Sequence, residues 1–453
     1  MNSLLLFAVT YFAVAHGAKR PLSEQYLNTI SKLYGLDIRA SNSDFLEFAL
    51  KEQERLLKQK SKRELVVGEP VLDCDTTNPG GEPTTVHDLR PWDIDLVGAL
   101  GDSITGGERQ WEIAVLGGPK GCSIRDKLDE YAANIGGNGS LFGQDRVVSL
   151  PNIIRQWNPD VEGFAIGTGG TTNSNSGLNR AVGGATNRYK LTSNACNSTL
   201  NIDYKIFQRN MLDQAENLIS RIQSDDRYDF DNDWKIITIF VGTNDLCSVC
   251  RNSNYDPVAH RDGIEAALDE LHANLPRALV QVVGMFDITT LTELSTGELC
   301  NMLQSAFCPC AADPETRPEM RPTQLSYVNL LDELISSGKY DTRDDFTVVF
   351  QPHMRDIVPP KDENGEYYPD FLSYDCFHPA RPAHQMFAMY LWDAMLTPVG
   401  EKTYWEEADP NHTVITCPRE GAPYIYTNLN SRRMVKSNVD KKTEVNIRQL
   451  CNR

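Results

Sequence analysis

The chain has 453 residues, of which 40% are hydrophobic and 23% are charged, so it can bury one large core or two medium ones. Its 62 acidic residues outnumber its 44 basic residues, which gives a formal charge of −18. An acidic balance argues against binding to a phosphate backbone and offers no electrostatic attraction to anionic membranes. We therefore expect no nucleic-acid partner.

The first 20 residues contain an apolar stretch that is too short to span a bilayer comfortably. Ala15 and Gly17 are small residues at the positions that signal peptidase requires, so residues 1–17 are predicted to be a signal peptide. An uncleaved anchor is the alternative. No later stretch is apolar enough for a transmembrane helix, and the carboxyl end lacks the hydrophobic tail of a lipid-anchor signal. We expect a secreted protein without a transmembrane anchor.

Eleven cysteines and three glycosylation sequons, at Asn138, Asn197 and Asn411, agree with an extracellular location. The spacing of Cys247 and Cys250 is compatible with zinc, but in a secreted chain it favours disulfides. We expect neither a metal nor a cofactor. The sequence leaves the pairing open, and Cys376 is either a disulfide partner or a buried thiol.

The chain divides into five segments by composition. Residues 18–75 are predicted to be a charged helical N-terminal segment, and the Pro- and Gly-rich residues 76–85 a linker. The main domain is expected over residues 86–420, followed by a polar tail at 421–453.

Within the main domain, short apolar runs alternate with stretches of helical periodicity. The runs predict buried strands at 96–100, 236–241, 277–288 and 346–350. The periodic stretches predict helices at 207–222, 264–275, 326–338 and 384–395. This alternation indicates an α/β fold with a mostly parallel sheet that is covered by helices on both faces.

Four short blocks lie at or near the predicted strand ends, where α/β proteins bind ligands. They are Gly-Asp-Ser-Ile at 101–104, Leu-Asn-Arg-Ala-Val-Gly-Gly-Ala-Thr at 178–186, Gly-Thr-Asn-Asp at 242–245 and Asp-Cys-Phe-His at 375–378. Each block alone has a structural explanation, such as a helix cap at Ser103 or an Asx turn at Asn244. Together, and in this order, they contain the groups that acyl transfer from an ester requires.

Acyl transfer needs a nucleophile, a base, a group that orients the base and donors for the oxyanion. Ser103 is the predicted nucleophile and His378 the base, with Asp375 orienting the imidazole from three residues earlier. The predicted oxyanion donors are the N–H of Ser103, the N–H of Gly184 and the side-chain amide of Asn244. Thr105 replaces the second glycine of the Gly-x-Ser-x-Gly elbow, which weighs against the ordinary α/β-hydrolase fold.

These four blocks resemble, in order and spacing, the signature blocks of the GDSL (SGNH) hydrolases. Stretches such as DWKIITIFVGTNDLCSVC and YDCFHPARPAH are similar to the phospholipase B lipases of animals. The resemblance implies a three-layer α/β/α sandwich related to flavodoxin. It also implies that Ser103, Gly184, Asn244 and His378 carry the four signature roles and that Asp375 completes the triad.

The resemblance implies hydrolysis of acyl esters of glycerophospholipids and lysophospholipids, with the substrate met at a lipid interface. Two alternatives stay open. One is a GDSL esterase that acts on acyl esters other than phospholipids. The other is a secreted binding protein that keeps the fold without turnover.

Overall fold

The structure is a computed structural model. It describes residue 55 and residues 63–106, 141–142, 147–166, 171, 173–187, 210–294, 296–373 and 376–434. The predicted signal peptide, the sequons at Asn138 and Asn197, and Asp375 lie outside the described residues. Within the described part of the chain, no helix is both long enough and apolar enough to cross a bilayer.

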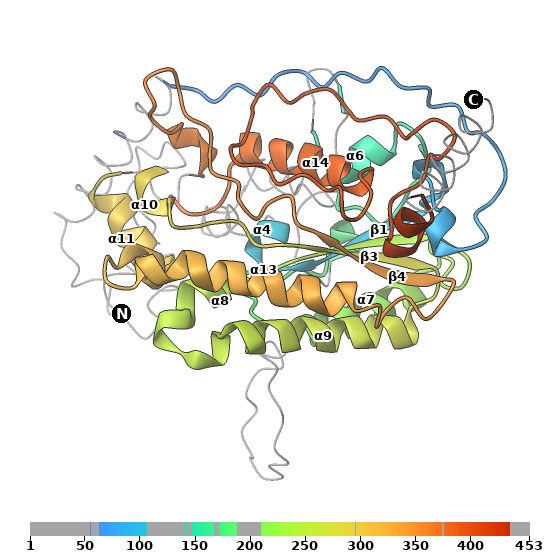
Figure 1. The fold of residues 1–453 in the computed structure, drawn as a ribbon, viewed down its shortest axis with the longest axis horizontal. Helices are drawn as coiled ribbons and strands as arrows, with labels where there is room; N and C mark the ends of the chain where they lie inside the picture. The colour runs from blue at the N-terminus through green and yellow to red at the C-terminus, as the bar shows by residue number, and fades with distance from the viewer. Residues whose placement is uncertain are drawn as a thin grey trace, which may run out of the picture.

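Four parallel strands form the sheet that the described residues share (Figure 1). In order across the sheet they are β1 (Leu96–Gly101), β2 (Lys235–Phe240), β3 (Ala278–Val283) and β4 (Phe346–Gln351). Every strand residue is buried, as expected for a sheet that is covered on both faces. The four predicted strands are thereby confirmed.

The outer side of β1 is also occupied. Leu96 forms a parallel bridge with Glu162, and Ala99 forms one with Asn179. The N–H of Val182 also donates to the carbonyl of Gly101, at 3.1 Å. Glu162, Asn179 and Val182 therefore pair with the outer edge of β1, so that edge of the sheet is covered.

Helices cover both faces of the sheet (Figure 1). On one face lie α7 (Met211–Ser224), α9 (Pro257–Asn274) and α13 (Met320–Ser336), and on the other lie α6 (Leu150–Ile154) and α14 (Arg381–Met395). Alternate strand residues enter the two cores: Ile237 packs on the α7 and α9 side, and Ile236 on the α14 side. This is the three-layer α/β/α sandwich that the sequence predicted, and the prediction is confirmed.

Local sequence explains where the long helices begin. The side chain of Asn210 accepts the N–H of Asp213 and caps α7. Asp256 caps α9 through the N–H of Ala259, and Pro257 follows at the first helical position.

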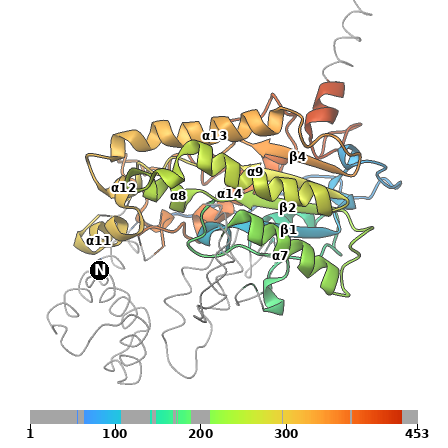
Figure 2. The same cartoon turned by 90° about the horizontal axis from the view of Figure 1, so that it is seen from below.

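Shorter elements connect this framework. They are η2 (Val86–Asp88), η3 (Pro91–Asp93), α4 (Ser103–Gly106), η6 (Ser174–Ser176), α8 (Thr243–Ser248), η8 (Val249–Arg251), η9 (Ser253–Tyr255), α10 (Leu291–Leu294), α11 (Glu298–Phe307), α12 (Pro309–Ala312), η10 (Arg317–Glu319) and η11 (Pro369–Phe371). Viewed from below, α8, α11 and α12 gather at one end of the molecule (Figure 2). Since α8 directly follows β2, this is the end to which the strands deliver their carboxyl termini.

Four disulfides join cysteines of the described residues. They are Cys74–Cys417, Cys247–Cys308, Cys250–Cys310 and Cys300–Cys376. The expectation of disulfides over zinc at Cys247 and Cys250 is confirmed. The open question at Cys376 is also answered, because its partner is Cys300.

The two ends of the described chain differ from the sequence-based expectation. Residues 63–75 of the predicted helical segment are extended, because Val71 pairs with Val414 and Cys74 is bonded to Cys417. The predicted domain boundary at residue 420 falls within packed structure. Beyond it, Ile425 and Tyr426 are buried, and residues 428–434 are helical.

Candidate active site

Ser103 is the first residue of α4, and only Asp102 separates it from the end of β1. Its side chain is 4% exposed. The turn from β1 into α4 is fixed by the Thr105 hydroxyl, which donates to the carbonyl of Phe240 at 2.7 Å. A methyl group on Gly101 would lie 2.3 Å from that carbonyl, so the turn requires glycine at position 101. Strand β2 therefore holds the serine turn against the end of the sheet.

The hydroxyl oxygen of Ser103 lies 2.8 Å from Nε2 of His378. The imidazole packs edge-to-face on Phe377, with ring centroids 4.8 Å apart, and lies 6.3 Å from the Phe307 ring. The Cys300–Cys376 disulfide ties the chain two residues before His378 to α11. The structure thus brings two of the predicted site residues into direct contact.

Asp102 is a buried carboxyl beside this pair. One carboxyl oxygen accepts the N–H of Ile104 at 3.0 Å. Burial raises the pKa of Asp102 to about 6, although the Ile104 N–H and the nearby His378 favour its charged form. The predicted orienting residue, Asp375, lies outside the described residues.

Gly184 and Asn244 come together at the same end of the sheet. Gly184 has a φ of +74°, a conformation that favours glycine. Asn244 lies in the first turn of α8, and its Nδ2 donates to the carbonyl of Ala185 at 2.9 Å. This bond joins the loop of Gly184 to the start of α8, so the second and third blocks are in contact.

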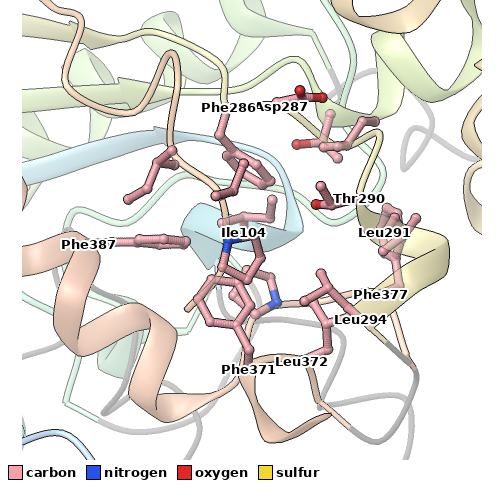
Figure 3. A pocket seen from close by; sticks show the side chains of 16 residues that line it. Ile104, Phe286, Asp287, Thr290, Leu291, Leu294, Phe371, Leu372, Phe377 and Phe387 are labelled. Atoms are coloured by element: carbon pink, nitrogen blue, oxygen red, sulfur yellow. The ribbon is translucent and has the colours of Figure 1, made fainter. Parts of the chain in front are cut away.

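A largely apolar pocket opens beside Ile104, the residue that follows Ser103 (Figure 3). Its empty space, counted together with open solvent at its mouth, is about 510 Å³. It is lined by Ile104, Thr243, Phe286, Asp287, Ile288, Thr290, Leu291, Leu294, Ile357, Val358, Pro359, Phe371, Leu372, Phe377, Pro379 and Phe387. The pocket directly adjoins the pair, because Ile104 follows Ser103 in the chain while Phe377 and Pro379 flank His378.

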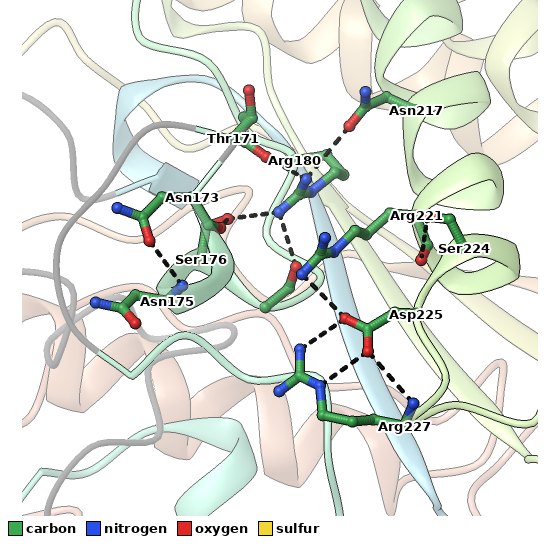
Figure 4. A network of polar contacts seen from close by, with 11 residues as sticks. Thr171, Asn173, Asn175, Ser176, Arg180, Asn217, Arg221, Ser224, Asp225 and Arg227 are labelled. Carbon is green, nitrogen blue, oxygen red and sulfur yellow. Dashed lines mark hydrogen bonds and ion pairs between the residues drawn. The ribbon is translucent and has the colours of Figure 1, made fainter.

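The glycine-rich stretch 167–177 reads from its composition as a wall of an acyl site. Its described residues, 171 and 173–177, do not line the pocket. They surround the buried Arg180, which donates to the carbonyls of Thr171 and Gly177 and to the Ser176 hydroxyl (Figure 4). Burial and the nearby Arg221 lower the pKa of Arg180 to about 10. The backbone acceptors of this stretch are thus used to hold a buried cation.

Two buried polar residues next to the site escaped sequence analysis. Asn187 is 1% exposed and follows the second block at once, while His260 is fully buried on α9. Their side chains meet at 2.8 Å, between Nδ2 of Asn187 and Nδ1 of His260. The position of Asn187 three residues after a glycine pair was a usable signal, whereas nothing in the α9 sequence distinguishes His260 from a core residue.

Among the described residues, no group of three His, Cys, Asp or Glu side chains converges so that it could hold a metal ion. His384 is the fourth residue of α14. Its ring packs edge-to-face on Phe387, with centroids 6.0 Å apart. Burial and His378 lower the pKa of His384 to about 4. His384 is therefore a packing residue at neutral pH.

A parallel α/β sheet with a serine and a histidine in contact at its carboxyl edge, beside an apolar pocket, is the arrangement of an ester hydrolase. A model of the GDSL-like lipase/acylhydrolase family matches residues 97–391. The chain belongs to this family. The match runs from the second residue of β1 into α14, so it includes all but one residue of the sheet and both members of the Ser103–His378 pair.

Three curated relatives are similar over most of this chain. Mouse (Mus musculus) "Phospholipase B1, membrane-associated" is 36% identical over 391 residues, which cover 84% of this chain and 24% of the relative. The human (Homo sapiens) protein of the same name is 35% identical over 388 residues, which cover 83% of this chain and 24% of the relative. The rat (Rattus norvegicus) protein is 35% identical over 390 residues, with 84% and 25% coverage. The chain therefore spans about a quarter of the length of these relatives.

Proposed function

We propose that this chain is a secreted serine esterase of the phospholipase B type. It releases free fatty acids from the acyl esters of glycerophospholipids and lysophospholipids. The observation that carries the proposal is the 2.8 Å contact between Ser103 Oγ and His378 Nε2 at the edge of an apolar pocket. The names of the relatives supply the substrate class.

In the proposed reaction, Ser103 Oγ attacks the acyl carbonyl carbon while His378 Nε2 takes the hydroxyl proton. The negative charge on the carbonyl oxygen is met by the N–H groups of Ser103 and Gly184 and by the Asn244 amide. His378 then gives its proton to the leaving alcohol, and a water molecule, deprotonated by His378, releases the fatty acid. The proposal gives Asp375 the role of orienting the imidazole.

The apolar pocket supports a fatty acyl substrate over a polar one. Burying a hydrocarbon chain against apolar walls yields about 0.8 kcal/mol per CH₂ group. Only a few of the residues that line the pocket carry polar side chains, among them Thr290 and Asp287. We therefore place the acyl chain in this pocket, with the ester carbonyl at Ser103 and the headgroup toward solvent at a lipid interface.

The test of the substrate class is a panel of phosphatidylcholine, lysophosphatidylcholine and short nitrophenyl esters, assayed with the wild-type chain and with Ser103→Ala. Turnover of both phospholipids that Ser103→Ala abolishes supports the proposal. Turnover confined to the nitrophenyl esters would indicate a GDSL esterase with another acyl substrate. Turnover of nothing, with a folded wild-type chain, would indicate a binding protein.

Secretion is part of the proposal, supported by four disulfides among the described residues and by the sequons. Asn411 is exposed in a turn where its N–H donates to Asp409 at 2.8 Å, so this sequon is accessible to glycosylation. Expression in secreting cells followed by glycosidase treatment tests this. A mass shift in protein recovered from the medium supports secretion, and retention of an unglycosylated chain inside the cell contradicts it.

A further inference from the structure

The loop that carries Gly184 is held at two points by adjacent residues of α8. Asn244 Nδ2 donates to the carbonyl of Ala185 at 2.9 Å. The main-chain N–H of Asn187 lies 3.0 and 3.2 Å from the two carboxyl oxygens of the buried Asp245. The two bonds bracket the loop immediately after Gly184, so its position relative to the start of α8 is fixed.

A third attachment comes from α9, beneath the loop. The side-chain Nδ2 of Asn187 lies 2.8 Å from Nδ1 of His260. Burial lowers the pKa of His260 to about 3, so the imidazole is neutral at physiological pH and Nδ1 accepts the amide hydrogen. The ring of His260 stacks on Tyr327 at 4.0 Å, with an angle of 11° between the planes. His260 is therefore itself held in one orientation by α13.

Close backbone approaches leave this arrangement little freedom. A methyl group on Gly263, one turn after His260 on α9, would lie 1.8 Å from the carbonyl oxygen of Asn187. A methyl group on Gly242 would lie 2.6 Å from Cε1 of His260. Helix α9 therefore contacts the loop and the start of α8 with no space between them.

We propose that Asn187, Asp245 and His260, here called the Asn187 cluster, are positioning residues for the oxyanion donors. The inference rests on the proposed function, in which the Gly184 N–H and the Asn244 amide stabilise the oxyanion. Asn244 has two amide hydrogens, and the carbonyl of Ala185 takes one. The cluster fixes the loop and thereby aims the other hydrogen at the reacting oxygen.

Fold stability alone does not favour the pairing of the Asn187 and His260 side chains, because Asn187 Oδ1 and His260 Nε2 are buried without a hydrogen-bond partner. Buried polar atoms cost free energy unless they are paired, and an apolar core of the same volume avoids that cost. Oxyanion donors, in contrast, act only when they are held close to the position of the developing charge. Three directional bonds on one short loop meet that requirement.

The test uses His260→Phe, which keeps an aromatic ring against Tyr327 and removes the acceptor for Asn187. The matched control is His272→Phe on the same helix, since His272 also contacts a side chain, Thr342 Oγ1, at 2.9 Å and packs edge-on against Tyr340. We expect His260→Phe to lower kcat by about 10- to 100-fold, less than the ~100- to 1,000-fold cost of deleting an oxyanion donor. KM should change by less than about twofold, because the cluster acts on the transition state.

Two further measurements separate positioning from a general loss of stability. In an Asn244→Ala background, His260→Phe should cost little more, since both changes act through the same donor. Amide hydrogen exchange of the peptide 178–187 should accelerate in His260→Phe and stay unchanged in His272→Phe. If His260→Phe does not fold, Asn187→Ala carries the same measurements, because it removes only the side-chain amide.

A kcat for His260→Phe equal to that of His272→Phe would overturn the proposal, as would unchanged exchange of peptide 178–187. The exchange measurement does not depend on catalysis. A folded wild-type chain without esterase activity would refute the proposed function, while the exchange of 178–187 would still decide whether the Asn187 cluster holds the loop.

Discussion

Ser103 Oγ and His378 Nε2 lie 2.8 Å apart, although 275 positions separate the two residues in the chain. The serine is fixed by the end of β1 and by its turn against β2. The histidine lies on a loop that is held by contacts from other parts of the chain. Gln304 Nε2 donates to the carbonyl of Cys376 at 3.1 Å, and Cys376 is bonded to Cys300. The geometry of the pair therefore depends on how this loop is anchored.

The disulfide between Cys300 and Cys376 should affect catalysis as well as stability. Replacing both cysteines by alanine is expected to cost about 2–4 kcal/mol of folding free energy. It should also lower kcat by at least about 10-fold, because a displacement of ~1 Å at the reacting groups can cost about 100-fold. Urea unfolding and initial rates on a nitrophenyl ester measure the two effects.

The matched control is removal of Cys74–Cys417, which joins the extended segment at 63–75 to the chain beyond α14. This change should lower stability while kcat is preserved. Equal kcat values for the two double variants would contradict the anchoring role of Cys376.

The apolar pocket should set the preference for acyl chain length. Leu294 on α10 lines the pocket and is 7% exposed (Figure 3). Leu294→Trp fills part of the space, so kcat/KM for a long-chain ester should fall by at least about 10-fold relative to an acetyl ester. Leu294→Ala enlarges the pocket and should spare long chains. Equal losses on both esters in Leu294→Trp would show that the acyl chain binds elsewhere.

Asp245 should make stability depend on pH in a specific direction. Burial, and then the nearby Asp102, raise the pKa of Asp245 from 3.8 to about 8. Between pH ~4 and pH ~8 the Asp245 carboxyl keeps its proton in the folded chain and loses it in the unfolded chain. The contribution of Asp245 to the free energy of unfolding is therefore fully present below pH ~4 and is lost as the pH rises through about 8.

Asp245→Asn cannot titrate and resembles the neutral carboxyl, so the wild-type advantage over this variant should shrink as the pH rises. The difference in unfolding free energy between the two chains should change by more than about 1 kcal/mol between pH 5 and pH 8.5. The reason is that a pKa difference of one unit between folded and unfolded chain corresponds to about 1.4 kcal/mol. Urea unfolding of both chains at the two pH values measures it, with the exposed Asp226→Asn as the control. A constant difference would contradict a neutral Asp245.

The strands and the site blocks were predictable because each leaves a local pattern. Strands that are buried on both faces need unbroken apolar runs, and the run at 346–350 is β4 almost residue for residue. Ser103 and His378 were singled out as candidates because their chemistry is recognisable in short blocks at strand ends. Their contact confirms that the blocks meet in space.

Features that arise from long-range contacts were not predictable. Phe286 and Phe371 line one pocket, although nothing near either residue indicates a common surface. His260 has the appearance of a core residue in its helix, and only the fold places Asn187 against it. The charged composition of residues 18–75 predicted a helical segment. Its described residues 63–75 are instead extended, because Val71 pairs with Val414.

The central claim, that Ser103 is the nucleophile, is tested most directly with a fluorophosphonate probe. The probe should label the wild-type chain at Ser103, located by mass spectrometry of the modified peptide. Ser103→Ala should keep its unfolding temperature, remain unlabelled and hydrolyse no ester above background. Labelling of a different residue in the wild-type chain, or ester hydrolysis by folded Ser103→Ala at a rate near that of the wild type, would contradict the account.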